Sequence, residues 1–450
     1  MPVSRIIHDG AMMDDRACLV DIFKAALSAV DPYRVVLDQK QAILETYERG
    51  RSISLYVIAF GKAAHGMVRA VTDSMAPMVS GGVAVTKYGH WVSMDSSGPI
   101  RVYEAGHPLP DENGQRATAE ALKIARGLDE RALLLCLISG GGSALLVAPA
   151  PGILLTEKQR TTEVLLKSGA DIYELNAVRK HLSAVKGGRL AAIASPARVE
   201  SLILSDVIDD RLDVIASGPT APDETTYGEA LGVIEKYGLV DEIPRKAYDL
   251  LVRGAQGRLP ETLKEGDPLF ERVRITIVGS NRQAIEGAKK RCEAKGLDAL
   301  VVDNAVRGEA REAGRRLARL AREVLMQRGG SGRGLCMISG GETTVVVRGR
   351  GKGGRNMELA LAAAMEIEGV DNITFLSGGT DGTDGPTDAA GAIVDGYSIA
   401  RGRAKGLDER ACLLDNDAYR FLEASGDLFV TGPTGTNVMD IQLILVRAPA

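Results

Sequence analysis

The feature that most constrains the fold of this chain is a short phrase that occurs three times. "CLISGGGSALL" at residues 136–146 and "CMISGGETTVV" at residues 336–346 share one construction, and "ITFLSGGTDG" at residues 373–382 is a looser copy. Each copy is an apolar run, typical of a buried strand, that stops at Ser-Gly-Gly. Glycine permits a sharp turn there and leaves backbone N–H groups uncovered. Because open α/β sheets bind ligands beyond the carboxyl ends of their strands, we expect these ends to gather around one or two small, charged ligands.

The length of the chain and a polar segment near its middle predict two domains. The 450 residues exceed what one hydrophobic core usually serves. Residues 253–273 are polar, contain two prolines and show little apolar periodicity, as a linker would. We therefore expect an N-terminal domain over residues 1–260 and a smaller C-terminal domain over residues 261–450, which opens with a strand at 274–281.

Strands alternate with helices along both halves, which predicts α/β domains, the first with a parallel sheet and right-handed crossovers. The long helical stretches are expected at residues 11–49, 120–128, 156–195 and 356–368. The strands, several with their following turns, are expected near residues 55–64, 81–87, 132–143, 200–210, 298–304, 334–341, 343–349, 373–380 and 441–447.

Composition excludes several classes of partner. The formal net charge of −4 and the lack of a basic stripe exclude a nucleic-acid footprint. No apolar stretch approaches the roughly 18–20 residues of a membrane span, and the N-terminus lacks the pattern of a signal peptide. The five cysteines are scattered without a CxxC pair, so neither a zinc site nor a disulfide framework is indicated. We expect a cytoplasmic monomer or homodimer that acts on a small molecule.

The first glycine-rich turn is a candidate anion site. Bare N–H groups that lead into a helix N-terminus attract phosphate or carboxylate, and the alternative is a tight turn that touches no ligand. No Walker pattern occurs in the chain. The candidate ligands are the backbone and side chains of Ser139, Gly140, Gly141, Gly142 and Ser143.

Lys62 and Asp206 also follow buried strands. A lysine at that position in an apolar segment points more plausibly at an anion than at solvent. A carboxylate there can hold a metal ion or accept a proton from a substrate hydroxyl, or it can cap the next helix. Spacing alone does not separate Asp206 from its neighbours Asp209, Asp210 and Asp213.

Cations cluster in "LNAVRKHLSAVKGGRLA" at residues 175–191. They form either one solvated helix face or a clamp for an anion. The two glycines of "KGGR" break the helix between cations, which is unusual in a purely structural helix. Arg179 and Lys186 are the candidate clamp.

In the second half, Arg355 stands at a predicted helix start. Asn356 as a cap and Glu358 in the first turn are ordinary there, but a cation is unfavourable at the positive end of a helix. Arg355 therefore needs an anionic partner, and phosphate suits its planar fork. The preceding segment "GRGKGG" at residues 349–354 matches the glycine pattern of a dinucleotide-binding motif only poorly. A hairpin turn or a flexible loop explains these glycines equally well.

A glycine-rich loop at residues 377–392 carries Asp381, Asp384 and Asp388. The loop lacks the alternating ligand positions and the terminal Glu of an EF-hand, so the sequence only weakly indicates a calcium site. We expect a loop that becomes ordered around a polyhydroxy substrate or a magnesium nucleotide.

Taken together, these motifs resemble those of the class II glycerate kinases, the glycerate 2-kinase family with a Rossmann-like kinase domain followed by a MOFRL domain. Some members of that family carry the label hydroxypyruvate reductase. The resemblance covers almost the whole chain and rests on "FGKAA", "LISGGGSALL", "LNAVRKHLSAVKGGRLA", "SDV" followed by "DVIASGPT", "SGGETTV", "GGRN" with "ELAL", and "TDGTDGPTDAAGA".

The resemblance implies transfer of a phosphoryl group from ATP, with Mg²⁺, to the 2-hydroxyl of D-glycerate, in an active site within the interdomain cleft. It implies catalytic roles for Lys62, Asp206 and Arg355, with Asp206 as a candidate metal ligand. Asn176 and Glu342 lie in matched motifs and join the candidate binding residues. The alternatives are an NAD(P)H-dependent hydroxypyruvate reductase and a non-catalytic binding protein.

The chain departs from the family pattern at two of these motifs. Met357 stands where the family usually has Gln, and Asp209 where Gly is usual. The Met removes a polar side chain near Arg355, two residues further along the sequence. Neither change touches the three residues with implied catalytic roles.

Overall fold

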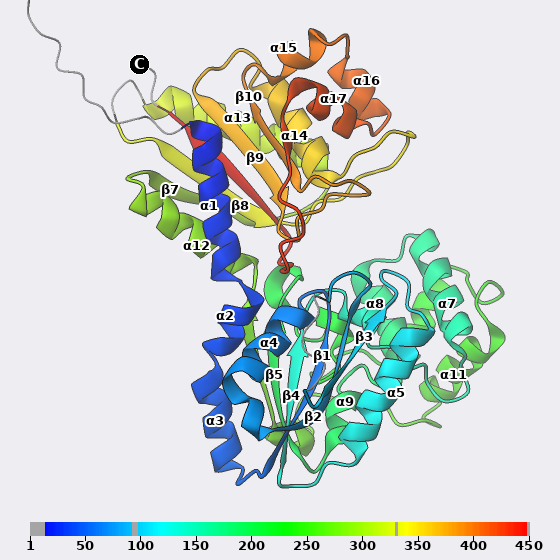
Figure 1. The fold of residues 1–450 in the computed structure, drawn as a ribbon. Coiled ribbons are helices and arrows are strands. Elements are labelled where there is room, and N and C mark those ends of the chain that lie inside the picture. The colour runs from blue at the N-terminus through cyan, green and yellow to red at the C-terminus, as the bar shows by residue number, and fades with distance from the viewer. Residues whose placement is uncertain (1–13, 92–97, 329–331, 448–450) are drawn as a thin grey trace, which may run out of the picture. The chain divides into compact units, whose positions relative to one another are not determined.

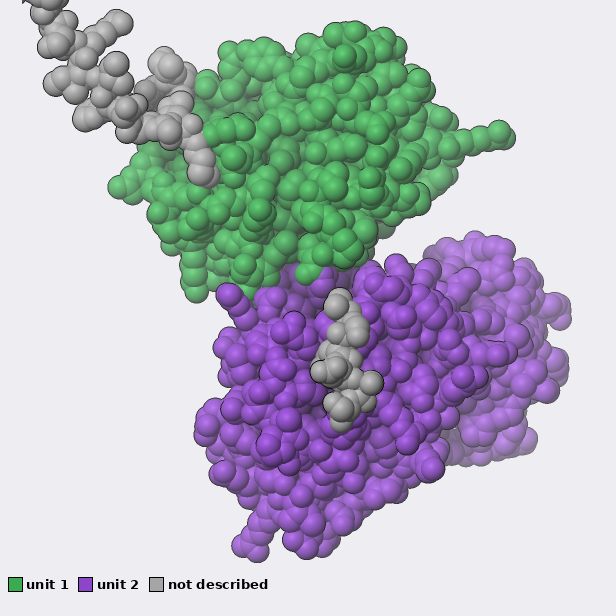
Figure 2. Space-filling view, in the orientation of Figure 1, with its two compact units in different colours: residues 1–29, 282–434, 439–450 green, residues 30–281, 435–438 purple. Residues whose placement is uncertain are grey.

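The computed structural model describes residues 14–91, 98–328 and 332–447 (Figure 1). Residues 1–13 fall outside that description. They include the start of the helix expected from residue 11 and part of the N-terminal stretch in which no signal peptide is expected. The chain forms two compact units, coloured separately in Figure 2. Unit 2 comprises Val30–Asn281 and Gly435–Val438, and unit 1 comprises Met1–Ala29, Arg282–Thr434 and Met439–Ala450.

Unit 2 is built on a parallel sheet of six strands in the order β3-β2-β1-β4-β5-β6. The strand order reverses between β1 and β4, as in doubly wound α/β sheets. The predicted α/β fold with a parallel first sheet is confirmed. The strands are β1 (Ser54–Phe60), β2 (Val79–Lys87), β3 (Ile100–Ala105), β4 (Ala132–Ile138), β5 (Arg198–Leu204) and β6 (Val273–Gly279).

The central strands β1, β4 and β5 are buried on both faces, which is why their sequences are largely apolar. In β1, Val57 and Ala59 belong to the core under α2, α3 and α4, whereas Ile58 and Phe60 belong to the core under α5 and α9. The alternation follows the two-residue period of a strand. The helices of unit 2 are α2 (Pro32–Leu37), α3 (Lys40–Arg49), α4 (Ala64–Met75), α5 (Glu112–Arg126), α6 (Gly142–Leu145), α7 (Leu155–Ser168), α8 (Ile172–His181), α9 (Arg189–Ala194), α10 (Tyr227–Lys236) and α11 (Arg245–Ala255).

Unit 1 is built on a mixed sheet in the order β11-β10-β9-β12-β8-β7. Its central strand β12 runs antiparallel to both neighbours, β8 and β9. The strands are β7 (Asp298–Val306), β8 (Leu335–Gly341), β9 (Ile373–Gly379), β10 (Gly391–Asp395), β11 (Leu428–Phe429) and β12 (Asp440–Val446). This arrangement confirms the predicted mixed α/β character of the second half.

Helix α14 (Arg355–Glu366) is the centre of the unit 1 core. Its residues from Met357 to Ala364 are all buried, and it packs against α13 (Ala310–Arg328) and the sheet. The other helices of unit 1 are α1 (Asp15–Ala29), α12 (Asn281–Ala294), α15 (Ser398–Arg403), α16 (Glu409–Leu414) and α17 (Ala418–Ser425). Among the described residues, no helix combines the length and apolarity that a membrane crossing requires.

The structure divides the chain differently from the predicted boundary at residue 260. The strand expected to open the second domain is β6, which pairs in parallel with β5 at the edge of the first sheet. Helix α1 joins unit 1, where Phe23 packs edge-on against Phe429 at a ring-centroid distance of 5.1 Å. The sequence shows the apolar face of α1, but Phe429, which packs against this face, lies about 400 residues further along the chain.

The strand expected at residues 343–349 is not formed. Only Thr344 makes a bridge, to Glu309, and the side chains of Val346 and Val347 are exposed. The run of β-branched residues favours an extended backbone, but no neighbouring strand pairs with it among the described residues.

Candidate active site

Three strand ends of unit 2 meet at the point where the sheet order reverses. Phe60 at the end of β1 is paired with Ile138 at the end of β4, and Ile138 with Ile203 near the end of β5. The backbone N–H of Lys62 donates to the carbonyl of Gly140 at 2.9 Å, and that of Ala63 donates to Ser139 Oγ at 3.1 Å. In sheets of this kind, ligands bind in the crevice beyond the carboxyl ends of the strands, at the point where the strand order reverses.

Lys62 and Asp206 both border the first glycine-rich turn. A Cβ added at Gly140 would lie against the Asp206 carboxylate and 3.0 Å from the side-chain amide of Asn437. A Cβ added at Gly141, which has φ of +81°, would lie 2.9 Å from the His107 ring and 3.5 Å from Lys62 Cγ. The turn is therefore glycine because these side chains surround it closely.

A buried polar network continues from this turn. Ser143 Oγ lies 2.8 Å from Ser217 Oγ, which donates to Asn176 Oδ1 at 3.1 Å. Ala216 and Ser217 have positive φ angles of 51° and 61°. Non-glycine residues in that region cost free energy and occur often at functional sites. The predicted binding residues Ser143 and Asn176 are thus connected through Ser217.

The "KGGR" break brings Lys186 into the same neighbourhood. Gly187 and Gly188 have φ of 59° and 78°, and their N–H groups donate to the carbonyls of Ser217 and Gly218. This pairing places Lys186 Nζ 3.0 Å from the carbonyl of Ala216. The two glycines are needed because L-residues with side chains rarely adopt this backbone.

Two buried lysines, Lys158 and Lys186, lie near the partly buried Arg179. Lys158 Nζ donates to the carbonyls of Arg179 and Leu182 at 2.9 and 3.1 Å. Burial, together with the charges of Arg179 and Arg189, lowers the pKa of Lys158 to about 7. Burial, together with the charges of Lys158 and Arg179, holds the pKa of Lys186 well below its usual range, and burial lowers the pKa of Arg179 to about 10. An anion among these groups would stabilise their charged forms.

Not every cation of this segment belongs to that group. Lys180 forms buried ion pairs with Asp223 and, at 3.4 Å, with Asp213. His181 lies 3.1 Å from Glu261. Lys180 and His181 are therefore assigned a structural role, because each has a carboxylate partner in the same unit.

In unit 1, the other two copies of the repeated phrase flank one strand. Asp440 at the start of β12 is opposite Gly341 of β8 and Gly379 of β9. Two residues further on, Gln442 is opposite Ser339 and Ser377 and accepts a hydrogen bond from Ser339 Oγ at 3.2 Å. The Ser-Gly-Gly ends are thus nearly symmetric about β12.

Arg355 reaches the acidic group at this position. It donates to both carboxylate oxygens of Asp440 and also to Glu342. Burial by itself would lower the pKa of Arg355, but the charges of Asp440 and Glu342 outweigh it and raise that pKa. Burial raises the pKa of Asp440, against the effect of Arg355. The anionic partner that the sequence required for Arg355 is therefore supplied within the protein.

The acidic loop supplies the cap of α14. Asp384 accepts hydrogen bonds from the N–H groups of Asn356 and Met357 at 3.1 and 2.8 Å. Burial and the nearby charge of Asp440 raise its pKa to about 7, although these backbone hydrogen bonds lower it. Asn356 Oδ1 accepts from Ser377 Oγ, and Asp381 accepts from Thr383 within its own loop. No group of three acidic, histidine or cysteine side chains suited to a metal ion occurs among the described residues.

Two residues next to Arg355 in the sequence point elsewhere. Both oxygens of Glu358 are engaged, one by Arg311 at 2.6 Å and the other by Asn416 at 2.7 Å. The Met357 side chain is fully buried in the hydrophobic core. Met357 therefore belongs to the core of unit 1, and Glu358 has structural partners within the fold.

The "GRGKGG" segment is a loop packed on residues 415–419. Gly349 donates its N–H to Asn416 Oδ1, and Cβ atoms at Gly349 or Gly351 would collide with Asp415 and Asp417. The glycines are required by this packing. A dinucleotide fingerprint would instead have its glycines facing a pyrophosphate at a helix N-terminus.

The predicted site residues thus form two groups, one on each unit. Lys62, Asp206, Asn176, Arg179, Lys186 and the turn at 139–143 lie in unit 2, and Glu342, Arg355, Asn356, Asp381 and Asp384 lie in unit 1. Sequence reasoning missed His107, Lys158, Ser217, Asn437 and Asp440. Asp440 had a signal, an acid directly before an apolar strand, and Ser217 stands in the matched motif "DVIASGPT", whereas the other three stand in segments of ordinary polarity.

Known proteins resemble this chain over nearly its whole length. A model described as "Domain of unknown function (DUF4147)" matches residues 18–252, and the MOFRL family model matches residues 335–440. D-glycerate 2-kinase of Thermotoga maritima is 44% identical over 431 residues, which are 95% of this chain and 97% of the relative. A protein of Agrobacterium vitis whose name suggests a hydroxypyruvate reductase is 41% identical over 433 residues, 96% and 94% of the two chains. A crystal structure of glycerate kinase from Thermotoga maritima has a TM-score of 0.85 at 42% identity and covers 96% of this chain and 99% of that chain.

Proposed function

This chain belongs to the glycerate kinase family, and on this basis we propose that it transfers the γ-phosphoryl group of ATP to the 2-hydroxyl of D-glycerate, giving 2-phosphoglycerate and ADP. The observation that carries the proposal is that Lys62 and Asp206 both border the Gly140–Gly141 turn at the reversal of the unit 2 sheet. Phosphoryl transfer needs positioning and neutralisation of charge more than covalent catalysis. A bare glycine turn between a cation and a carboxylate supplies both.

In this proposal the ATP phosphates rest on the turn at residues 139–143. The positive φ of Gly141 and the absence of side chains at residues 140–142 let phosphate oxygens approach backbone N–H groups. Lys62 balances the charge on the transferring group. Its neighbour His107, which borders Gly141, limits the room for larger groups.

Asp206 either takes the proton of the 2-hydroxyl or holds Mg²⁺. The residues present fit the ion, because the Asp206 carboxylate lies directly against Gly140 of the turn, and Mg²⁺ accepts one carboxylate together with phosphate oxygens. When bound, the ion would neutralise charge on the phosphate oxygens. A titration separates the two roles: Asp206→Asn raises the Mg²⁺ requirement if Asp206 is a ligand, and lowers kcat at saturating Mg²⁺ if it is the base. Asp209→Asn, an exposed acid of the same loop, is the matched control.

Lys158, Arg179 and Lys186 hold the glycerate carboxylate. Burial lowers the pKa of each of the three groups, because water solvates their charges poorly in the free protein. A carboxylate would replace the missing solvation and bind best where several cations converge. Lys186→Met is expected to raise KM for D-glycerate about 10-fold or more with little change in KM for ATP, since one buried charge pair is worth at least 1.4 kcal/mol.

We further propose that Arg355 stabilises the transferring phosphoryl group. Arg355 presents a planar fork suited to phosphate. Its present partners, Asp440 and Glu342, hold that fork in place. The prediction of an active site within an interdomain cleft stays a prediction.

The first experiment is a coupled assay with purified full-length protein, ATP, Mg²⁺ and D-glycerate. Enolase, pyruvate kinase and lactate dehydrogenase detect 2-phosphoglycerate, while ADP is measured separately by nucleotide chromatography. Product without added phosphoglycerate mutase supports the proposal. A signal only with the mutase would mean phosphorylation at the 3-hydroxyl, and no ADP would overturn the kinase assignment.

The reductase alternative is tested in parallel by NADH and NADPH oxidation with hydroxypyruvate. The only segment that matched a dinucleotide pattern packs its glycines on residues 415–419. We therefore expect no oxidation above the rate of a protein-free control.

A further inference from the structure

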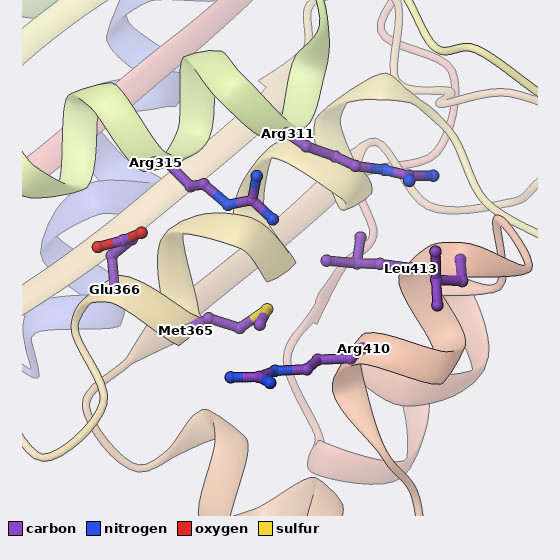
Figure 3. Close-up of a pocket in the computed structure, with 7 residues that line it drawn as sticks. Arg311, Arg315, Met365, Glu366, Arg410 and Leu413 are labelled. Carbon is purple, nitrogen blue, oxygen red and sulfur yellow. The ribbon is translucent and has the colours of Figure 1, made fainter.

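Unit 1 has a pocket that the proposed reaction does not use. Its volume is about 420 Å³, and it lies between α13, the end of α14, and α16 (Figure 3). This volume falls within the range of small-molecule sites, roughly 300–1,000 Å³. Cationic and apolar side chains line it, namely Arg311, Arg315, Arg410, Met365, Leu413 and Leu414.

The charge in the pocket is mainly positive. Glu366 is its one acidic lining residue, and both of its oxygens accept hydrogen bonds from Arg319, at 2.8 and 3.1 Å. Arg315 pairs with Glu312, whose side chain is 68% exposed, so this pair is weak. Arg410 has no ion-pair partner among the residues that the structure describes, and Figure 3 shows it reaching from α16 towards Met365.

A third arginine adds an unmet donor. Arg311 gives its Nε to Glu358, but its buried Nη2 has no hydrogen-bond partner within the described part of the chain. Buried donors are normally satisfied. The Arg311 guanidinium is directed towards Glu358, and in Figure 3 it extends away from Arg315 and Arg410, so it is not counted among the ligand-binding groups of the pocket.

The apolar part of the lining is equally distinct. Leu414 is 69% exposed beside the buried Leu413, and Met365 lies between the arginines in Figure 3. Methionine and leucine favour an apolar or aromatic surface over a bare inorganic ion. The ligand that satisfies both parts of the lining has an acidic head and an apolar body.

We propose that this pocket binds a phosphate monoester with an apolar substituent, its phosphate held by Arg315 and Arg410 and its substituent against Met365, Leu413 and Leu414. Arginine forks match phosphate oxygens in pairs. The site is separate from the one at Arg355, because α14 has 12 residues and Arg355 and Glu366 are its two ends, about 16–18 Å apart.

The pocket is also connected to that distant end. Arg311 lines the pocket and holds Glu358, which is one turn from Arg355 on the same helix. A change at Arg311 would therefore reach the first turn of α14.

The test is calorimetric titration of the full-length protein with phenyl phosphate. We expect binding that weakens at least 10-fold in Arg410→Ala and in Arg315→Ala and stays unchanged in Arg420→Ala, an exposed arginine of α17 outside the pocket. Inorganic phosphate and benzyl alcohol, which each lack one half of the probe, should bind more weakly. Thermal melts confirm that the exposed Arg410 variant remains folded.

Lys62→Ala separates this site from the proposed ATP site. Phenyl phosphate should bind Lys62→Ala as it binds the wild type. Loss of binding in Lys62→Ala with full binding in Arg410→Ala would overturn the inference, as would no binding to the wild type at millimolar probe or equal binding of inorganic phosphate. None of these outcomes depends on whether the chain phosphorylates glycerate.

Discussion

Arg355 and Asp440 form a two-pronged ion pair, with Nε donating to one carboxylate oxygen at 2.6 Å and Nη2 to the other at 3.0 Å. Asp440 is 1% exposed and lies between the Ser-Gly-Gly ends of β8 and β9. The pair joins the start of α14 to the central strand of the unit 1 sheet. It therefore has a structural role beside any role in catalysis, and the two roles can be measured separately.

Arg355→Ala should lower kcat about 10³-fold if Arg355 stabilises the transferring phosphoryl group. It should also lower the free energy of unfolding by about 2 kcal/mol, less than the loss for a fully buried pair because the Arg355 side chain is 33% exposed. Steady-state kinetics and urea unfolding measure the two effects.

The double variant Arg355→Ala/Asp440→Asn is the control for folding. It leaves no unpaired buried carboxylate, so it should recover most of the lost stability while kcat stays low. Recovery of kcat along with stability would mean that Arg355 acts only through the fold. A loss confined to KM would make it a binding residue.

Gly140→Ala should abolish most activity. The added methyl would overlap the Asp206 carboxylate, so this side chain must move from the position that the proposed reaction requires. Gly140 does not have a positive φ, so the backbone itself tolerates alanine. Activity and thermal melting of the variant are compared with those of Gly232→Ala, a glycine of α10 with nothing within 4 Å of an added Cβ, which should be fully active and up to about 1 kcal/mol more stable. Wild-type activity in Gly140→Ala would show that the reaction does not depend on the present position of the Asp206 carboxylate.

Lys158 predicts a specific pH dependence of stability. Burial lowers its pKa from 10.5 in the unfolded chain to about 7 in the folded protein. The unfolded state therefore takes up the proton first, and the contribution of Lys158 to stability, complete above pH 10.5, is lost as the pH falls towards 7. The difference in unfolding free energy between the wild type and Lys158→Met should shift in favour of the variant between pH 10 and pH 7.

Lys158→Met also removes the hydrogen bonds from Lys158 to the carbonyls of Arg179 and Leu182. Their loss lowers the unfolding free energy of the variant by an amount that varies weakly with pH, so the pH trend of the difference between the two proteins is little affected. Urea unfolding at several pH values measures the trend. Lys167→Met, an exposed lysine of the same helix, should show no such trend. A flat difference for Lys158→Met would mean that the ammonium is well solvated in the folded state.

Asp209→Gly should leave stability unchanged or raise it by up to about 1 kcal/mol. Asp209 has φ of 67°, a left-handed conformation that costs non-glycine residues free energy. The same conformation gives a physical reason for the glycine usual at this position in the family. Asp209→Ala and Asp209→Val should be progressively less stable by thermal melting, since neither can hydrogen-bond locally and valine is branched. Equal melting temperatures across the three variants would contradict strain at this position.

The sequence by itself determined the local features of this protein. Apolar runs that end in Ser-Gly-Gly predicted β4, β8 and β9, and the glycines of "KGGR" predicted a break that the structure confirms between α8 and α9. It also singled out Lys62, Asp206 and Arg355, because strand ends and helix starts impose chemical demands on the residue that stands there. These features depend on neighbours within a few residues, which a pattern in the sequence records.

Only the tertiary structure decided which of these features meet. Asp440 lies beside Arg355 because β12 enters antiparallel between β8 and β9, and no local pattern specifies that register. Lys158 joins Arg179 and Lys186 through the packing of α7 on α8, and Glu358 is drawn away from Arg355 by Arg311 and Asn416. Whether an acidic side chain faces a ligand or pairs within the fold depends on partners that lie tens to hundreds of residues away in the sequence. The free energy that selects those partners comes from burial in the folded protein.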